Sequence, residues 1–366
     1  MKIVIASGIY PPDIGGPATY SKLILQEFKK KGHDVSLICY SDKKDNDVNR
    51  ILRKNKLSRY FKYFLKLLSL ARNCDVIYAQ GPLSAGLPAM WVSKILNKRL
   101  VIKIVGDYAW EQANNQFDIN DSIDAFQERK YCYEVERIRK IQKKVVNYAD
   151  SIIVPSNYLK KIVSGWGAKN INVVYNAFVG GDIKEKKLDG DVIISAGRLE
   201  PWKGMDLLVD IFPDLLKENP NFKLLVIGYG PLEKKINKKV KELKLGKQVE
   251  LIDQVPHEEL MGYFKSGFAF VLNTGYEGLS HILLECLAMG LPVITTNVCG
   301  NPEVIENNVN GILVEYNNKE DFKEAILKLY KDKELRNKFI KNGKEKLKNF
   351  SLDKMINNTL EKLKNI

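Results

Sequence analysis

The sequence predicts an α/β protein built from two doubly wound parallel-sheet domains, and three observations lead to this prediction. The chain has 366 residues, which is enough for two domains that each bury a core of their own. Short apolar runs alternate with helical stretches, and this order is typical of parallel sheets with helices on both faces. The alternation stops once, at the glycine-rich and charged stretch 176–191, and then restarts.

The first half begins with an apolar run at 2–7, which is too short for a signal peptide and predicts a strand. Glycines before Pro17 predict the start of a helix, because proline fits the first helical turn, and Gly32 predicts its end. Further strands are expected at 35–40, 76–79, 100–105, 150–155 and 171–175, with a helix at 84–96.

The second half repeats this pattern. Strands are expected at 192–196, 223–228, 249–252, 268–273, 292–296 and 311–314, with helical sequence from 319 onward. These elements predict a first domain at 1–178, a linker at 179–190 and a second domain at 191–351. Doubly wound domains bind ligands at the carboxyl ends of their strands, so we expect the site there, in a cleft between the domains.

Positive charge is concentrated in the first half. The net charge is +14, with 29 Lys and Arg against 16 Asp and Glu in residues 1–180, but 29 against 28 in residues 181–366. A basic half predicts an anionic partner, such as a membrane surface, a nucleic acid or an acidic substrate. A lysine-rich composition by itself would have charged both halves.

The composition excludes several classes of protein. Apolar residues make up 45% and charged residues 28%, which excludes a disordered or collagen-like chain. No run of about 18 apolar residues is present, so no membrane-spanning helix is expected. The five cysteines form no CxxC pair, which argues against a zinc knuckle or a disulfide framework and favours a reducing, cytoplasmic location.

The most informative motif lies at 276–293. A strand is expected to end near Asn273, and a helix to start near Ser280, with Glu277 before the helix and Glu285 inside it. A helix N-terminus offers free N–H groups and partial positive charge, which suit a phosphate or a sugar oxygen. Either glutamate could instead be solvated or cap the helix. Glu285, however, is flanked by apolar residues, so its carboxylate needs a partner.

A second loop, at 196–204, carries Arg198 and Lys203 directly after a predicted strand. Arginine offers a fork of donors and lysine a point charge, and together they suit a diphosphate. Two such cations can neutralise a leaving diphosphate in place of Mg²⁺, so neither a metal nor another cofactor is expected. The alternative is that both side chains are solvated loop cations.

Two glycine loops complete the motifs. Gly15 and Gly16 precede the first helix, and their amides could meet an anion. The GxG sequence at 228–230 is weak evidence and fits a tight turn or a close backbone approach. No GxGxxG follows the first strand, which argues against a dehydrogenase.

Taken together, these motifs resemble the retaining glycosyltransferases of family 4, which have the GT-B fold of two Rossmann-like domains. The resemblance covers essentially the whole chain. The E-x7-E pair, the GRL-x-x-x-KG loop and the N-terminal GGP loop occur in the family's order and at its spacing. It implies a nucleotide diphosphate sugar as donor, a glycan or lipid-linked acceptor, and a C-terminal helix at 352–366 that crosses back to the first domain.

The resemblance also implies roles for individual residues. Arg198 and Lys203 would bind the donor diphosphate, Glu285 the ribose hydroxyls and Glu277 the hydroxyls of the transferred sugar. The nucleotide base would lie near 254–257. Further donor contacts would come from the glycine loop and from the turn before the E-x7-E helix, namely Gly15, Gly16, Gly278, Leu279, Ser280 and His281.

One departure concerns the catalytic centre. The family usually has a histidine after the strand predicted at 100–105, whereas this chain has Gly106 followed by Asp107. None of the three histidines replaces it by position. Asp107 is the nearest polar residue and is expected to face the sugar or the acceptor hydroxyl. The alternative is that Asp107 caps a turn, a position that aspartate favours.

A basic amphipathic helix is expected around 54–68. Its apolar residues at helical spacing are Leu57, Tyr60, Phe61, Phe64, Leu65 and Leu68, and Arg59, Lys62 and Lys66 lie on the other face. Helices with this pattern bind anionic membrane surfaces. An ordinary outer helix that packs its apolar face into the core has the same pattern.

The sequence therefore predicts a retaining, hexosyltransferase-type enzyme of cell-envelope or surface polysaccharide and glycolipid synthesis. Its expected catalytic residues are Asp107, Glu277, Arg198 and Lys203. The alternatives are a GT-B relative of other chemistry, such as an inverting transferase or an epimerase, and a non-catalytic nucleotide-sugar-binding protein. No nucleic-acid partner is expected, because the basic half lacks a recognition motif. The expected location is cytoplasmic, at the inner face of the membrane if the basic helix binds lipid.

Overall fold

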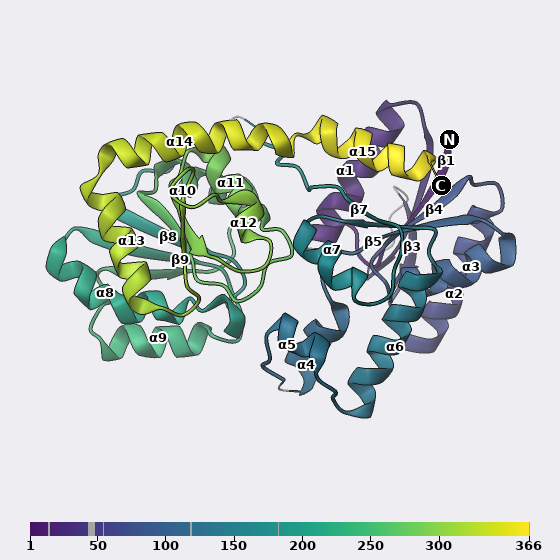
Figure 1. Ribbon diagram of the computed structural model, residues 1–366, viewed down its shortest axis with the longest axis horizontal. Helices are drawn as coiled ribbons and strands as arrows, with labels where there is room; N and C mark the ends of the chain where they lie inside the picture. The colour runs from purple at the N-terminus through teal and green to yellow at the C-terminus, as the bar shows by residue number, and fades with distance from the viewer. Residues whose placement is uncertain (14, 43–47, 54, 118, 182, 366) are drawn as a thin grey trace. The chain divides into compact units, whose positions relative to one another are not determined.

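The computed structural model describes residues 1–365 except 14, 43–47, 54, 118 and 182. Its contacts divide the chain into two compact units: Met1–Tyr175 with the residues from Asp353 onward, and Asn176–Leu352. Each unit is a parallel sheet between helices, so the predicted fold class is confirmed (Figure 1).

The first unit contains a seven-stranded sheet in the order β3-β2-β1-β4-β5-β6-β7. Its strands are β1 (Lys2–Ala6), β2 (Asp34–Ser41), β3 (Asn49–Leu52), β4 (Val76–Gln80), β5 (Arg99–Lys103), β6 (Ser151–Val154) and β7 (Ile171–Val173). All neighbouring pairs are parallel. Strand β1 lies between β2 and β4, and the strand order changes direction there. Ligands of doubly wound folds bind at such a topological switch point.

Helices cover both faces of the first sheet (Figure 1). They are α1 (Gly16–Lys30), α2 (Lys56–Ala71), α3 (Gly86–Leu96), α4 (Tyr108–Phe117), α5 (Ile123–Glu128), α6 (Tyr133–Tyr148), α7 (Asn157–Ser164) and α15 (Leu352–Lys364). Helices α2, α3, α6 and α7 share one hydrophobic core with the sheet. On the other face, Tyr20 of α1 lies 2.9 Å from Tyr78 of β4, hydroxyl to hydroxyl, and contacts Thr359 of α15.

The second unit contains a six-stranded parallel sheet in the order β10-β9-β8-β11-β12-β13. Its strands are β8 (Asp191–Ala196), β9 (Phe222–Ile227), β10 (Val249–Ile252), β11 (Ala269–Leu272), β12 (Val293–Thr296) and β13 (Ile312–Val314). The stretch 179–190, predicted as a linker, touches this unit, since Lys186 N donates to Gly262 O at 3.1 Å. Residue 182 lies outside the described residues.

Helices also cover both faces of the second sheet. They are the 3-10 turns η1 (Pro201–Lys203) and η2 (Lys348–Phe350), and α8 (Asp206–Glu218), α9 (Glu233–Glu242), α10 (His257–Ser266), α11 (His281–Met289), α12 (Asn301–Val304), α13 (Lys319–Lys331) and α14 (Lys333–Leu347). Helices α8, α9 and α13 share a core with one face of the sheet. On the other face Phe264 of α10 meets Phe270 of β11, with ring centroids 5.4 Å apart.

The α2 helix forms where the basic amphipathic pattern predicts it, but its buried side differs from the expected one. Tyr63, Leu67 and Ala71 enter the core, whereas Phe61 and Leu65 face solvent with 64% and 45% of their surface exposed. The Leu57 side chain is outside the part that the structure describes. None of the described helices has the length and apolar character that a bilayer crossing requires.

Candidate active site

Three loops meet at the carboxyl ends of β8, β9 and β11 in the second unit. A Cβ on Gly228 would lie 2.0 Å from Gly197 O, so only glycine allows the loops after β8 and β9 to approach this closely. Gly204 has a φ of +46°, and its carbonyl accepts from Asn273 Nδ2 at 2.9 Å. The GRL-x-x-x-KG loop is therefore fixed against the end of β11.

The Lys203 ammonium forms an ion pair with the Glu277 carboxylate. Both side chains are 15% exposed, so the pair is largely shielded from solvent. This contact joins the GRL-x-x-x-KG loop to the E-x7-E motif, two segments that are 74 residues apart. Arg198 lies on the same loop with 60% of its side chain exposed and its guanidinium 3.5 Å from Glu200, so it can reach a ligand.

The turn after β11 leads to the N-terminus of α11, with Ser280 as the N-cap residue. Ser280 is 1% exposed, and its Oγ has no hydrogen-bond partner among the described atoms. His281 opens the helix and contacts Asn176, with Nε2 and Nδ2 2.9 Å apart. Gly278 and Leu279 complete the turn, which the Gly300 amide holds by donating to Glu277 O at 2.9 Å. This arrangement presents a helix N-terminus and a hydroxyl beside Lys203 and Glu277.

Glu285 lies inside α11 and accepts a hydrogen bond from His257 Nε2 at 2.9 Å. This hydrogen bond raises the pKa of His257, because the carboxylate favours the protonated ring. A cavity of about 520 Å³ is lined by Tyr229 and residues 253–256. The loop expected to hold the base and the carboxylate expected to hold the ribose are thus in direct contact.

A second cavity, of about 500 Å³, lies at the carboxyl ends of the strands in the first unit. Its wall comes from the end of β2, from the loops after β1, β3, β4 and β5, and from the N-terminal parts of α1, α2 and α4. The lining residues are Gly8, Ile9, Pro17, Tyr40, Arg53, Arg59, Tyr60, Gln80, Pro82, Ser84, Val105, Gly106, Tyr108 and Glu111. Aromatic faces with a few charged groups are typical of small-molecule sites. Arg59, expected on the outer basic face of α2, lines this cavity instead.

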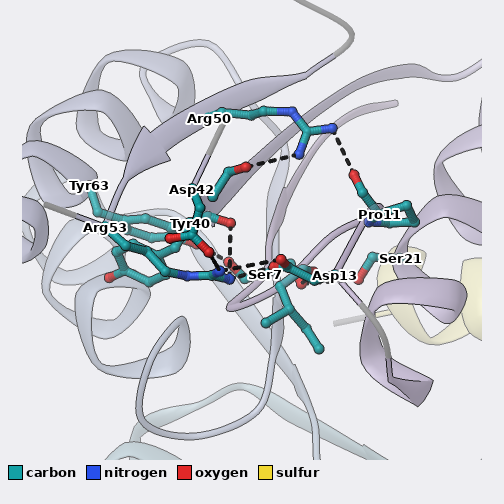
Figure 2. A network of polar contacts seen from close by, with 11 residues as sticks. Ser7, Pro11, Asp13, Ser21, Tyr40, Asp42, Arg50, Arg53 and Tyr63 are labelled. Carbon is teal, nitrogen blue, oxygen red and sulfur yellow. Dashed lines mark hydrogen bonds and ion pairs between the residues drawn. The ribbon is translucent and has the colours of Figure 1, made fainter. Parts of the chain in front are cut away.

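A polar network fixes the glycine loop beside this cavity (Figure 2). The Arg53 guanidinium donates to Asp42 Oδ2 at 2.8 Å and forms a bidentate pair with Asp13. Arg50 Nη2 donates to Pro11 O at 2.8 Å in the same loop. Asp13 lies just before Gly15 and Gly16, the N-cap and first residue of α1, so Arg53 helps to place that helix N-terminus.

Asp107 is buried, with 1% of its surface exposed. Its Oδ1 accepts from the Ala109 and Trp110 amides at 3.0 and 3.2 Å and from Gln142 Nε2 at 2.9 Å. Its Oδ2 accepts from Gln127 Nε2 at 2.8 Å. Both oxygens are thus committed to the first turn of α4 and to two later helices. This geometry matches the helix cap and differs from the expected side chain facing a sugar.

The structure thus brings Lys203, Glu277 and the turn 278–281 together, and Glu285 with His257. Sequence reasoning missed the Arg53 network and the buried Lys103. Lys103 Nζ lies 3.6 Å from the Tyr20 ring centroid, and burial lowers its pKa to about 7. A lysine inside the apolar run 100–105 was the signal that could have revealed it.

Comparisons with known proteins agree with this architecture. Residues 14–178 match the family model Glycosyltransferase Family 4, and residues 182–346 match Glycosyl transferases group 1. A glycosyltransferase of Methanocaldococcus jannaschii is 27% identical over 97% of this chain and 96% of its own. The alpha-monoglucosyldiacylglycerol synthase of Streptococcus pneumoniae is 25% identical over 89% of this chain and 78% of its own.

Solved structures show the same fold. Anabaena HepE in complex with UDP and glucose has a TM-score of 0.79 and 17% identity, over 100% of both chains. The sucrose-phosphate synthase of Thermosynechococcus elongatus has a TM-score of 0.77 and 16% identity, over 100% of this chain and 98% of its own. The two family models and the shared fold make this chain a member of the GT-B glycosyltransferases.

Proposed function

We propose that this glycosyltransferase is a retaining enzyme, which moves a hexosyl group from a nucleotide diphosphate sugar to an acceptor hydroxyl. The observation that carries the proposal is the ion pair of Lys203 and Glu277 beside the N-terminus of α11. This cluster offers a cation and N–H groups for phosphate oxygens, and a carboxylate for sugar hydroxyls. HepE, which shares the fold, is described in complex with UDP-glucose, and this supports a UDP-sugar donor.

In the proposed reaction the bond between the anomeric carbon and the diphosphate oxygen breaks first. Arg198, Lys203 and the positive end of α11 stabilise the charge on the leaving diphosphate. The acceptor oxygen then bonds to the anomeric carbon on the face that the diphosphate leaves, and its proton passes to a phosphate oxygen. Retention follows without a nucleophile from the protein, and the two cations replace a divalent metal.

Asp107 takes a positioning role in this proposal. Its carboxylate holds the turn after β5, and the cavity wall includes Val105, Gly106 and Tyr108 from that turn. Because both oxygens already accept hydrogen bonds, Asp107 has little capacity left to accept the acceptor proton.

The anomer of the product tests the mechanism. UDP-glucose and a panel of acceptors would be incubated with the full chain, and the new linkage assigned by proton NMR coupling constants. An α product from the α-linked donor supports retention. A β product supports the inverting alternative, and an epimerised sugar without acceptor supports an epimerase. Tight UDP binding without turnover on any acceptor would support a nucleotide-sugar-binding protein.

We also propose that the first unit docks on the anionic inner face of the cell membrane, for envelope glycolipid or surface polysaccharide synthesis. Phe61 and Leu65 on α2 and Trp91 and Ile95 on α3 are 64%, 45%, 43% and 59% exposed. Helices α2 and α3 pack against each other. Among the side chains that the structure describes, these two helices expose Lys62, Lys66 and Lys94. Apolar and basic residues together are typical of membrane-binding surfaces.

Two relatives support a lipid acceptor by their names, the monoglucosyldiacylglycerol synthase and a yeast phosphatidylinositol N-acetylglucosaminyltransferase subunit. The test is sedimentation with phosphatidylglycerol vesicles. Each basic residue near an anionic bilayer contributes about 1 kcal/mol, so replacing both Lys62 and Lys66 with Glu should weaken binding at least tenfold. The matched control reverses Lys160 and Lys161 on α7. Equal vesicle binding by all three proteins, or by none, would contradict the docking surface.

A further inference from the structure

We propose that the cavity of the first unit receives an acceptor that carries a phosphate or carboxylate, and that Arg59 binds this anionic group. The inference rests on the proposed glycosyl transfer and narrows the acceptor to a chemical class. The cavity volume of about 500 Å³ suits a phosphorylated sugar or a lipid headgroup.

The two arginines of the cavity wall differ in their charge balance. Arg53 is paired with Asp13 and Asp42, so two carboxylates of the protein already neutralise it (Figure 2). Arg59 is partly buried, and within the part of the chain that the structure describes no ion pair joins it to a carboxylate. A partly desolvated cation is stabilised by an anion, so a ligand is the natural counter-ion for Arg59.

Aromatic rings hold the Arg59 guanidinium in place. Its Cζ lies 5.2 Å from the ring centroid of Tyr60 and 6.0 Å from that of Tyr40. Contacts with ring faces restrict the side chain while leaving the N–H groups at the guanidinium edge available. A planar fork of donors matches the oxygens of a phosphate or carboxylate, so the group is preorganised for an anion.

The rest of the wall suits hydroxyl groups. Gln80 is 7% exposed, and its Nε2, although near Tyr78, meets no acceptor at hydrogen-bond distance among the described atoms. Glu111 and Tyr108 line the side that follows β5. A buried amide donor and a carboxylate acceptor can bind several hydroxyls of one ligand. The wall therefore favours a sugar or polyol phosphate, or a sugar acid, over a purely apolar acceptor.

Direct binding to the full chain tests the inference without requiring turnover. Isothermal titration would compare glycerol 1-phosphate with glycerol as probes. The wild type should prefer the phosphate. Arg59→Gln should bind it about 10- to 100-fold more weakly and lose the preference, because the charged hydrogen bonds are gone. Arg59→Lys should fall between them, since ammonium keeps the charge without the fork. The control Lys160→Gln, at an exposed position of α7, should match the wild type.

A wild type without preference for the phosphate, or an Arg59→Gln variant with unchanged affinity, would overturn the inference. UDP titrations and circular dichroism on the same samples report whether the second unit and the fold are intact. Failure of UDP binding would count against the proposed donor site and leave the anion result standing. If Arg59→Gln does not fold, Arg59→Lys decides the test. The inference then requires that Arg59→Lys binds glycerol 1-phosphate more weakly than the wild type, and an affinity equal to that of the wild type overturns the inference.

A competition arm separates two sources of the same anionic chemistry. Soluble short-chain phosphatidylglycerol is added to the titration with glycerol 1-phosphate. If phosphatidylglycerol competes, the anionic group belongs to a lipid headgroup. If phosphatidylglycerol does not compete, the anionic group belongs to a soluble phosphorylated glycan. Both outcomes support an anionic acceptor once the phosphate preference and its loss in Arg59→Gln have been measured.

Discussion

Replacing Asp107 with alanine should destabilise the first unit strongly. The carboxylate accepts from two backbone amides of α4 and from the side-chain amides of Gln127 and Gln142, all within 3.2 Å. Losing the helix cap costs about 1 kcal/mol, and each buried donor left unpaired costs about 1–3 kcal/mol. Partial relaxation lowers the total, so we expect a loss of about 3–5 kcal/mol, a large share of the about 5–15 kcal/mol that holds a domain folded.

Hydrogen exchange of the peptide 107–117 measures this locally, and urea unfolding measures the first unit as a whole. Asp107→Asn keeps the size of the side chain and one acceptor oxygen, but its N–H₂ group faces a neighbouring donor. This variant should therefore lose stability, but less than Asp107→Ala. Ser122→Ala is the matched control in the same unit, because exposed Ser122 caps α5 through a single amide at 3.2 Å and should lose only about 1 kcal/mol. Full stability of Asp107→Asn with complete loss of turnover would refute this reasoning and return Asp107 to the catalytic residues.

Three further predictions concern the second unit. Glu285→Ala should weaken UDP binding by about 2–5 kcal/mol, whereas Glu277→Ala should chiefly lower turnover; equal effects on UDP affinity would contradict the assigned roles. EDTA should leave turnover unchanged, and restoration of lost activity by Mg²⁺ or Mn²⁺ would contradict a metal-free mechanism. The raised pKa of His257 means that its pair with Glu285 stabilises the fold below about pH 6.5 and that this contribution is lost as pH rises through the raised value. The stability difference between wild type and His257→Gln should therefore shrink as pH rises above about 6.5, and a constant difference would exclude this linkage.

The strands were predictable because buried parallel strands are continuous apolar runs. The exception is β3, at the edge of the first sheet, where all four residues are only partly buried and include Asn49 and Arg50. An edge strand pairs on one side only, so its sequence lacks the apolar run. The sequence pattern did not predict the helices α4, α5 and α6 between β5 and β6 either.

Part of the candidate site could also be predicted from the sequence. Arg198 and Lys203 lie in the loop after β8, Glu277 lies in the turn after β11, and Glu285 lies in the helix that this turn starts. Parallel topology brings the ends of the adjacent strands β8 and β11 to one edge of the sheet. The ion pair of Arg53 and Asp13 could not be predicted, because it joins two loops that are 40 residues apart in the sequence. These loops come together only when β1, β2 and β3 align in the sheet. The direction in which Arg59 points depends likewise on which face of α2 the core buries.

The sequence by itself determined the two parallel-sheet units and the strand-end motifs, because apolar periodicity and glycine placement act over a few neighbouring residues. Only the tertiary structure decided that Asp107 is a cap, since its four donors come from a turn and from two later helices. It also decided that Arg53 is neutralised within the protein while Arg59 faces a cavity. Local sequence sets which element forms, but the charge balance of a side chain depends on partners that only the packed chain brings within hydrogen-bond distance.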